Sequence, residues 1–86
     1  MYAGTDSLYK DGMTAISEAR QLIAKTEAAL KDKGKAAEKA DRKQVKADIA
    51  ALNKNLFKCK PEKMNESDIA ALRDAIRKLE ESAARL

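Results

Sequence analysis

The sequence predicts an all-α protein, an antiparallel up-down-up bundle of three helices in a single domain over residues 1–86. Apolar residues recur every three or four positions in three stretches, which is the period of one face of an α-helix. Gly34 and Pro61 separate these stretches. The connections are short, and short connections make neighbouring helices antiparallel. We therefore expect helices at about 6–32, 38–58 and 65–86.

The start of the first helix has two competing signals. Gly4 and Gly12 each disfavour a helix interior by about 1 kcal/mol relative to Ala. Thr5 or Asp6 would cap a start near residue 6, and Thr14 would cap a later one. At the other end, Gly34 follows the last periodic residue, where a glycine in the left-handed conformation commonly ends a helix.

The middle helix has the clearest pattern, and we expect the other two helices to pack on it. Ile49 stands at its centre, so it is expected to be fully buried. Pro61 ends this helix, because the residue before a proline is pushed out of helical geometry. The bundle seam is predicted from the large aliphatic residues of the three stretches. It comprises Ile16, Ile23, Leu30, Val45, Ile49, Leu52, Leu56, Ile69, Leu72, Ile76 and Leu79.

The third helix carries clear start signals. Asn65 is a strong N-cap residue, and Glu66 and Asp68 place negative charge in the first turn. Met64 and Ile69 are spaced to close as a hydrophobic staple. On its outer face we expect three ion pairs at i, i+4, namely Asp74–Lys78, Arg77–Glu81 and Glu81–Arg85.

The chemistry-bearing residues indicate no enzyme, and we expect no catalytic, cofactor or metal site in these residues. The chain has no histidine and one cysteine, so neither a zinc pattern nor an internal disulfide is available. For Cys59 we favour a partly buried structural thiol over a reactive one whose pKa Lys58 and Lys60 would lower. No apolar run is long enough to span a membrane, and no secretory signal is visible, so we expect a cytoplasmic protein without a membrane partner.

The net charge of +4 is concentrated in residues 31–60, which hold ten Lys or Arg against four acids. Such a patch fits a nucleic-acid footprint. We favour a solvated helix face over nucleic-acid binding for two reasons. We expect no aromatic side chain beside these lysines for stacking on a base. Several charges also have opposite partners one turn away, such as Glu38 with Arg42 and Glu27 with Lys31.

One run of residues resembles a known family. It covers roughly residues 19–56 and reads Leu22-Ile23-x-x-Thr26-Glu27-x-x-Leu30-Lys31-x-x-Gly34-Lys35, followed by Arg42-x-x-Val45-x-x-x-Ile49-x-x-Leu52. This run is similar to the C-terminal helical lid of the 70-kDa heat-shock chaperones of the DnaK type. The third helix matches by pattern only.

The resemblance implies that the chain is a fragment of a longer chaperone, whose ATP and magnesium bind in another domain. The lid of this family closes over the peptide-binding domain of the same chain and slows the release of unfolded client segments. The implied partners are that domain and, indirectly, the clients. Two alternatives stay open: a nucleic-acid-binding bundle that uses the basic 31–60 region, and a free-standing helical protein-interaction module.

Overall fold

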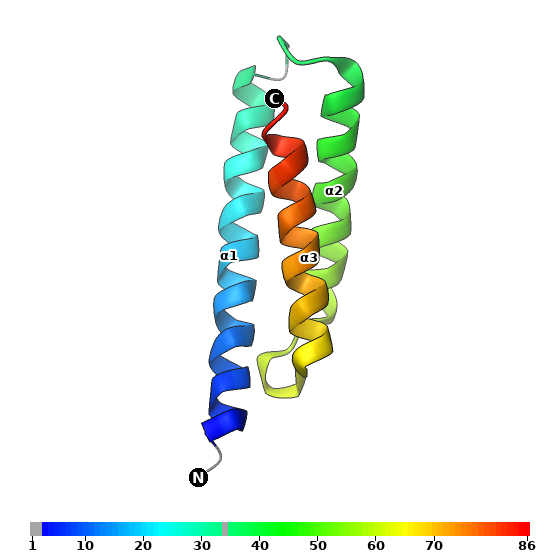
Figure 1. Ribbon diagram of the computed structural model, residues 1–86. Coiled ribbons are helices and arrows are strands. Elements are labelled where there is room, and N and C mark those ends of the chain that lie inside the picture. Colours follow the sequence, from blue (N-terminus) through cyan, green and yellow to red (C-terminus); the bar gives the residue numbers. More distant parts are fainter. Residues whose placement is uncertain (1–2, 34) are drawn as a thin grey trace.

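The computed structural model describes residues 3–33 and 35–86, with side chains from residue 7 onward. It contains three α-helices and one short 3₁₀ turn (Figure 1). The elements are α1 (Ala3–Lys33), α2 (Lys39–Lys58), η1 (Pro61–Lys63) and α3 (Glu66–Ala83). No strand occurs within the described residues, so the predicted all-α class is confirmed.

The helices pack side by side into a rod of 53 × 18 × 17 Å. The segment between α1 and α2 lies at one end of the rod, and η1 lies at the other (Figure 1). Helix α3 contacts α2 and α1 more extensively than α1 contacts α2. Both α1 and α3 pack on α2, as expected for the middle helix. Helix α3 also packs closely on α1, and it buries a residue at every three- or four-residue step from Ile69 to Leu79.

Helix α1 begins at Ala3 rather than near residue 6 or at Thr14, and it runs without interruption through Gly12. Its 31 residues correspond to about 45 Å. Gly12 is buried in this helix, next to Met64 and Pro61. The helix tolerates the glycine because the missing side chain leaves room for η1. The cap expected at Gly34 lies outside the described residues.

The boundaries of α2 match the expected range to within one residue. It begins at Lys39, after Glu38, whose side chain makes no capping hydrogen bond. It ends at Lys58, and Cys59 is already extended, with its backbone N–H donating to the Leu56 carbonyl. Pro61 then opens η1, where its fixed φ suits the first position of a helical turn.

Helix α3 starts at the predicted cap. The Asn65 side chain accepts a hydrogen bond from the Asp68 N–H at 2.9 Å, and the Asp68 carboxylate accepts one from the Asn65 N–H at 3.1 Å. This reciprocal pair is a capping box with Asp in the place usually taken by Glu or Gln. Met64 and Ile69 are both buried, as a hydrophobic staple requires. The helix ends at Ala83, three residues before the expected end, where the backbone tightens into i→i+3 hydrogen bonds.

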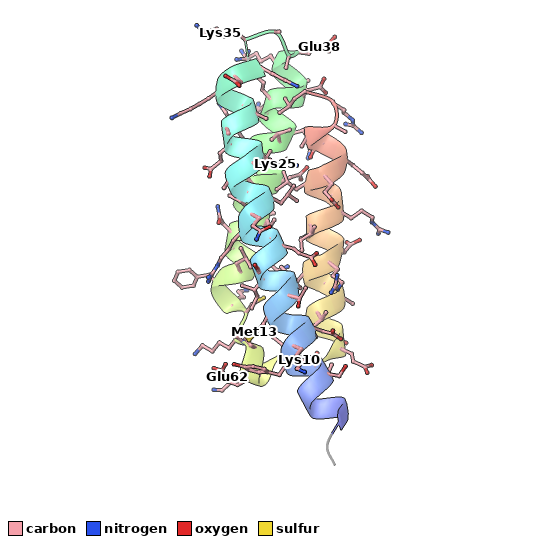
Figure 2. All side chains as sticks on the ribbon, turned by 90° about the vertical axis from the view of Figure 1, so that its left-hand side faces the viewer. Lys10, Met13, Lys25, Lys35, Glu38 and Glu62 are labelled. Carbon is pink, nitrogen blue, oxygen red and sulfur yellow. The ribbon has the colours of Figure 1, made fainter. Side chains whose placement is uncertain are left out.

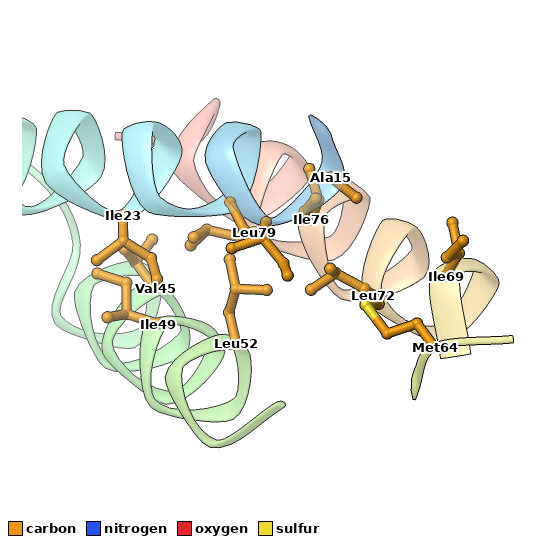
Figure 3. Close-up of a cluster of buried hydrophobic side chains, with 12 residues drawn as sticks. Ala15, Ile23, Val45, Ile49, Leu52, Met64, Ile69, Leu72, Ile76 and Leu79 are labelled. Atoms are coloured by element: carbon orange, nitrogen blue, oxygen red, sulfur yellow. The ribbon is translucent and has the colours of Figure 1, made fainter. Parts of the chain in front are cut away.

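The core is a continuous aliphatic cluster between the three helices (Figure 3). The largest of its completely enclosed side chains are Val45, Leu52, Leu72 and Leu79. Within the described residues, none of the helices combines the length and the apolar character that a membrane crossing requires.

Candidate functional site

The residues predicted for the bundle seam fall into two groups. Nine lie in the buried cluster: Ile16, Ile23, Val45, Ile49, Leu52, Ile69, Leu72, Ile76 and Leu79. Leu30 and Leu56 are only half-buried against it, because they occupy the last turns of α1 and α2, where fewer side chains surround them. Ile49 was expected to be fully buried. It lies in the core but retains 8% exposure, so its enclosure is not complete.

Several buried residues are missing from the predicted seam set. Ala15 and Ala19 are fully buried on α1, and Met64 is buried beside η1. The helical period also places Thr26 on the buried face, where it is 2% exposed. Its hydroxyl donates to the Leu22 carbonyl at 2.7 Å, which satisfies the polar group inside the core. Ala15, Ala19 and Thr26 follow the helical period and Met64 is the expected staple residue, but the predicted seam was limited to the large aliphatic residues of the three stretches.

Ser82 forms a polar contact between α2 and α3 that the sequence did not indicate. It is 4% exposed, and its hydroxyl lies within hydrogen-bonding distance of the Asp48 carboxylate on α2 and of the Lys78 carbonyl, the latter at 2.9 Å. A hydroxyl has one proton, and the charged carboxylate is the stronger acceptor. The contact joins α3 to α2 beside the aliphatic core.

Removal of the Ser82 hydroxyl should destabilise the protein moderately. We expect Ser82→Ala to lower the free energy of unfolding by about 1 kcal/mol, because water can reach the half-buried Asp48 and replace part of the bond. Urea unfolding of Ser82→Ala, Asp48→Ala and the double variant measures the coupling between them. If the effects of the two single changes simply add, the hydroxyl and the carboxylate do not interact.

Cys59 occupies the junction between α2 and η1. It is half-buried, and its thiol lies 3.2 Å from the Asn55 carbonyl. Burial raises the pKa of the Cys59 thiol, and the nearby Asp68 carboxylate adds to this rise. This direction is opposite to the one that Lys58 and Lys60 would produce, and it agrees with the favoured interpretation of Cys59 as a partly buried structural thiol. A thiol held protonated in this way is a poor nucleophile.

The ion pairs of α3 differ from those expected. Lys78 and Asp74 pair at 3.5 Å as predicted. Arg77, however, donates to Asp74 at 2.7 Å, so Asp74 takes both cations. The hydrogen bond from Arg77 and the charge of Lys78 hold the pKa of the Asp74 carboxyl below its usual range. Among the described residues, the other expected pairs do not approach within 4 Å: Arg77–Glu81, Glu81–Arg85, Glu38–Arg42 and Glu27–Lys31.

The basic middle of the chain has an aromatic side chain, contrary to expectation. Phe57 follows Lys54 by three residues and directly precedes Lys58 on α2. It is 91% exposed, whereas the other exposed large apolar side chains, Tyr9 and Met13, are about half covered. The sequence interpretation overlooked Phe57 because it considered the lysines without the residues between them.

Residues of metal-binding or catalytic type are dispersed. No group of three or more Cys, Asp or Glu side chains converges on one point within residues 7–33 and 35–86. The geometry offers packed helical faces and charged outer surfaces instead. Comparison of the chain with known protein-family models, with curated proteins and with solved structures finds no match.

Proposed function

We propose that the chain is the helical lid of an ATP-dependent chaperone of the DnaK type, folded as an up-down-up three-helix bundle. In this role it closes over the peptide-binding domain of the same polypeptide and slows the escape of unfolded client segments. It contributes no catalytic group, and ATP and magnesium bind elsewhere in the parent protein. Slower dissociation is the usual route to tighter binding.

The observation that carries this proposal is where the family-like run falls in the fold. The run occupies α1 from Leu22 onward, the turn, and α2 as far as Leu52. Its apolar members Ile23, Val45 and Leu52 are buried between helices. Helix α3 then covers both helices. The residues that resemble the DnaK-type lid thus include core residues of this bundle, as we expect if the two have the same architecture.

The shape supports a mechanical role. A rod of 53 × 18 × 17 Å with a continuous aliphatic core and fully enclosed leucines resists bending. Opposite ends of the rod carry the two connections (Figure 1). A stiff body of this kind can block the exit of a bound peptide without contacting it chemically.

A graft tests the proposal directly. Residues 1–86 replace the helical lid of a DnaK-type chaperone, and the dissociation of a fluorescent apolar peptide is followed in the ADP state. We expect the graft to release the peptide about tenfold more slowly than the same chaperone without any lid. Release as fast as from the lidless protein would contradict the proposal.

Two controls separate a lid from other roles. A graft that carries Leu52→Ala, which is expected to loosen the bundle, should behave like the lidless chaperone. The chain on its own should bind neither ATP nor the apolar peptide in calorimetric titrations.

A separate experiment measures the size of the parent protein. An antibody to the chain, applied to a native extract, should detect a polypeptide of the size of a 70-kDa chaperone. A band at 9.4 kDa would instead favour a free-standing interaction module.

A further inference from the structure

Helix α2 accounts for the net positive charge of the chain. This helix holds six Lys or Arg against two Asp, a net charge of +4 that equals the net charge of the chain. The remainder is therefore neutral overall. Asp41 and Asp48 are half-buried, and Asp48 contacts Ser82 of α3. The lysines of α2, by contrast, are all exposed.

These lysines lie along one outer face of the helix. The three- and four-residue spacing that aligns Val45, Ile49 and Leu52 toward the core also aligns a second set on the opposite face. That set, which we name the basic face, consists of Lys39, Lys43, Lys46, Ala50, Lys54, Phe57 and Lys58. It spans about 28 Å along the helix axis and contains no acid.

The structure removes both reasons for assigning these lysines to an ordinary solvated surface. Among the described residues, no carboxylate lies within 4 Å of any lysine on the basic face. On α3, in contrast, Arg77 and Lys78 both pair with Asp74. Phe57 also provides an exposed ring between Lys54 and Lys58 in the sequence.

We propose that the basic face of α2 binds single-stranded nucleic acid without sequence preference. The lysine ammonium groups contact successive phosphates, and the Phe57 ring stacks on one base. A length of about 28 Å accommodates on the order of four nucleotides, the lower end of single-strand site sizes. This proposal depends only on α2 and is independent of the lid function.

The chemistry of the basic face favours a single strand over other polyanions. A duplex keeps the faces of its bases stacked inside, so it offers the Phe57 ring no partner. An anionic membrane would be held by charge, but apart from Phe57 this face presents only lysine and alanine, too little apolar area to insert. An acidic peptide would match the charge but supplies no planar group for the ring.

The experiment measures binding of the full chain to a fluorescein-labelled 20-mer of oligo-dT by anisotropy at several salt concentrations. Five lysine–phosphate contacts predict a slope of log K against log salt of about −3.5. Lys43→Gln/Lys46→Gln should reduce this slope to about −2.1. The matched control is Lys10→Gln/Lys25→Gln on α1 (Figure 2), which changes the net charge equally and should leave the slope unchanged.

Phe57→Ala tests the stacking separately. It should weaken binding between about five- and a hundredfold without altering the salt slope, whereas Phe57→Trp should retain the affinity. Both substitutions are at an exposed helical position, and circular dichroism should show an unchanged fold. Duplex DNA should bind no more tightly than about 10⁻⁴ M near physiological salt.

Three results would overturn the proposal. The first is oligo-dT binding weaker than about 10⁻⁴ M near physiological salt. The second is an equal loss of slope in the α1 and α2 double variants, which would indicate a general effect of net charge. The third is tighter binding to the duplex, or to vesicles of anionic phospholipid, than to oligo-dT.

Discussion

Leu52→Ala is expected to lower the free energy of unfolding by about 2–5 kcal/mol. Leu52 lies in the second half of α2 and is completely enclosed between the helices (Figure 3). Truncation removes its buried methyl groups and leaves a cavity that the surrounding helices cannot fully close. A domain of this size has only about 5 kcal/mol of stability, so the variant should be partly unfolded at 37 °C. Thermal melts followed by circular dichroism measure the change.

Lys46→Ala is the matched control for Leu52→Ala on the same helix. Lys46 is exposed, and its truncation should change the stability by less than about 0.5 kcal/mol. Ile49→Ala, at a position that retains 8% exposure, should also destabilise the protein. If Leu52→Ala and Lys46→Ala melt at the same temperature, the buried face of α2 is not the one described here.

The sequence period predicted which helical faces are buried, because burial of an aliphatic stripe is what stabilises helices of this length. The start of α3 was predicted from the capping residue Asn65, because this side chain binds the backbone of its own first turn. Such local causes are visible in a single stretch of sequence. The relative importance of the three helices was not predicted, because α3 gains its central place from contacts with residues far away along the chain.

The features that were missed depend on how the side chains are arranged in three dimensions. Ser82 looks like an ordinary polar residue of α3 until Asp48, 34 residues away, is placed beside it. Asp74 has Lys78 and Arg77 within one turn. Spacing alone predicted only the pair with Lys78, and the pair with Arg77 depends on the conformations of the side chains. Phe57 falls outside the aliphatic period, and only the fold shows that nothing covers it.

Gly12 shows the same limitation most clearly. Within its own helix the residue is only a cost of about 1 kcal/mol relative to Ala, and for this reason a late start at Thr14 stood as an alternative to a start near residue 6. In the fold it is buried where α1 passes η1. A β-carbon at this position would lie 3.2 Å from the Met64 sulfur and 3.8 Å from the Pro61 Cα. The glycine therefore permits the close approach of two segments that are distant in sequence.

Gly12→Leu is accordingly expected to lower the free energy of unfolding by about 1–3 kcal/mol, because the added side chain must displace Met64 or push η1 away from α1. Gly12→Ala should stay within about 1 kcal/mol of the natural chain, since its better helix propensity offsets a small shift of the flexible Met64 side chain. Ala24→Leu, on the exposed side of α1, is the control and should be nearly neutral. The double variant Gly12→Leu/Met64→Ala should recover part of the loss relative to the sum of its single changes, because it empties the space that the leucine needs. Urea unfolding of these variants decides the point: if Gly12→Leu is as neutral as Ala24→Leu, α1 does not pack against η1 at this position.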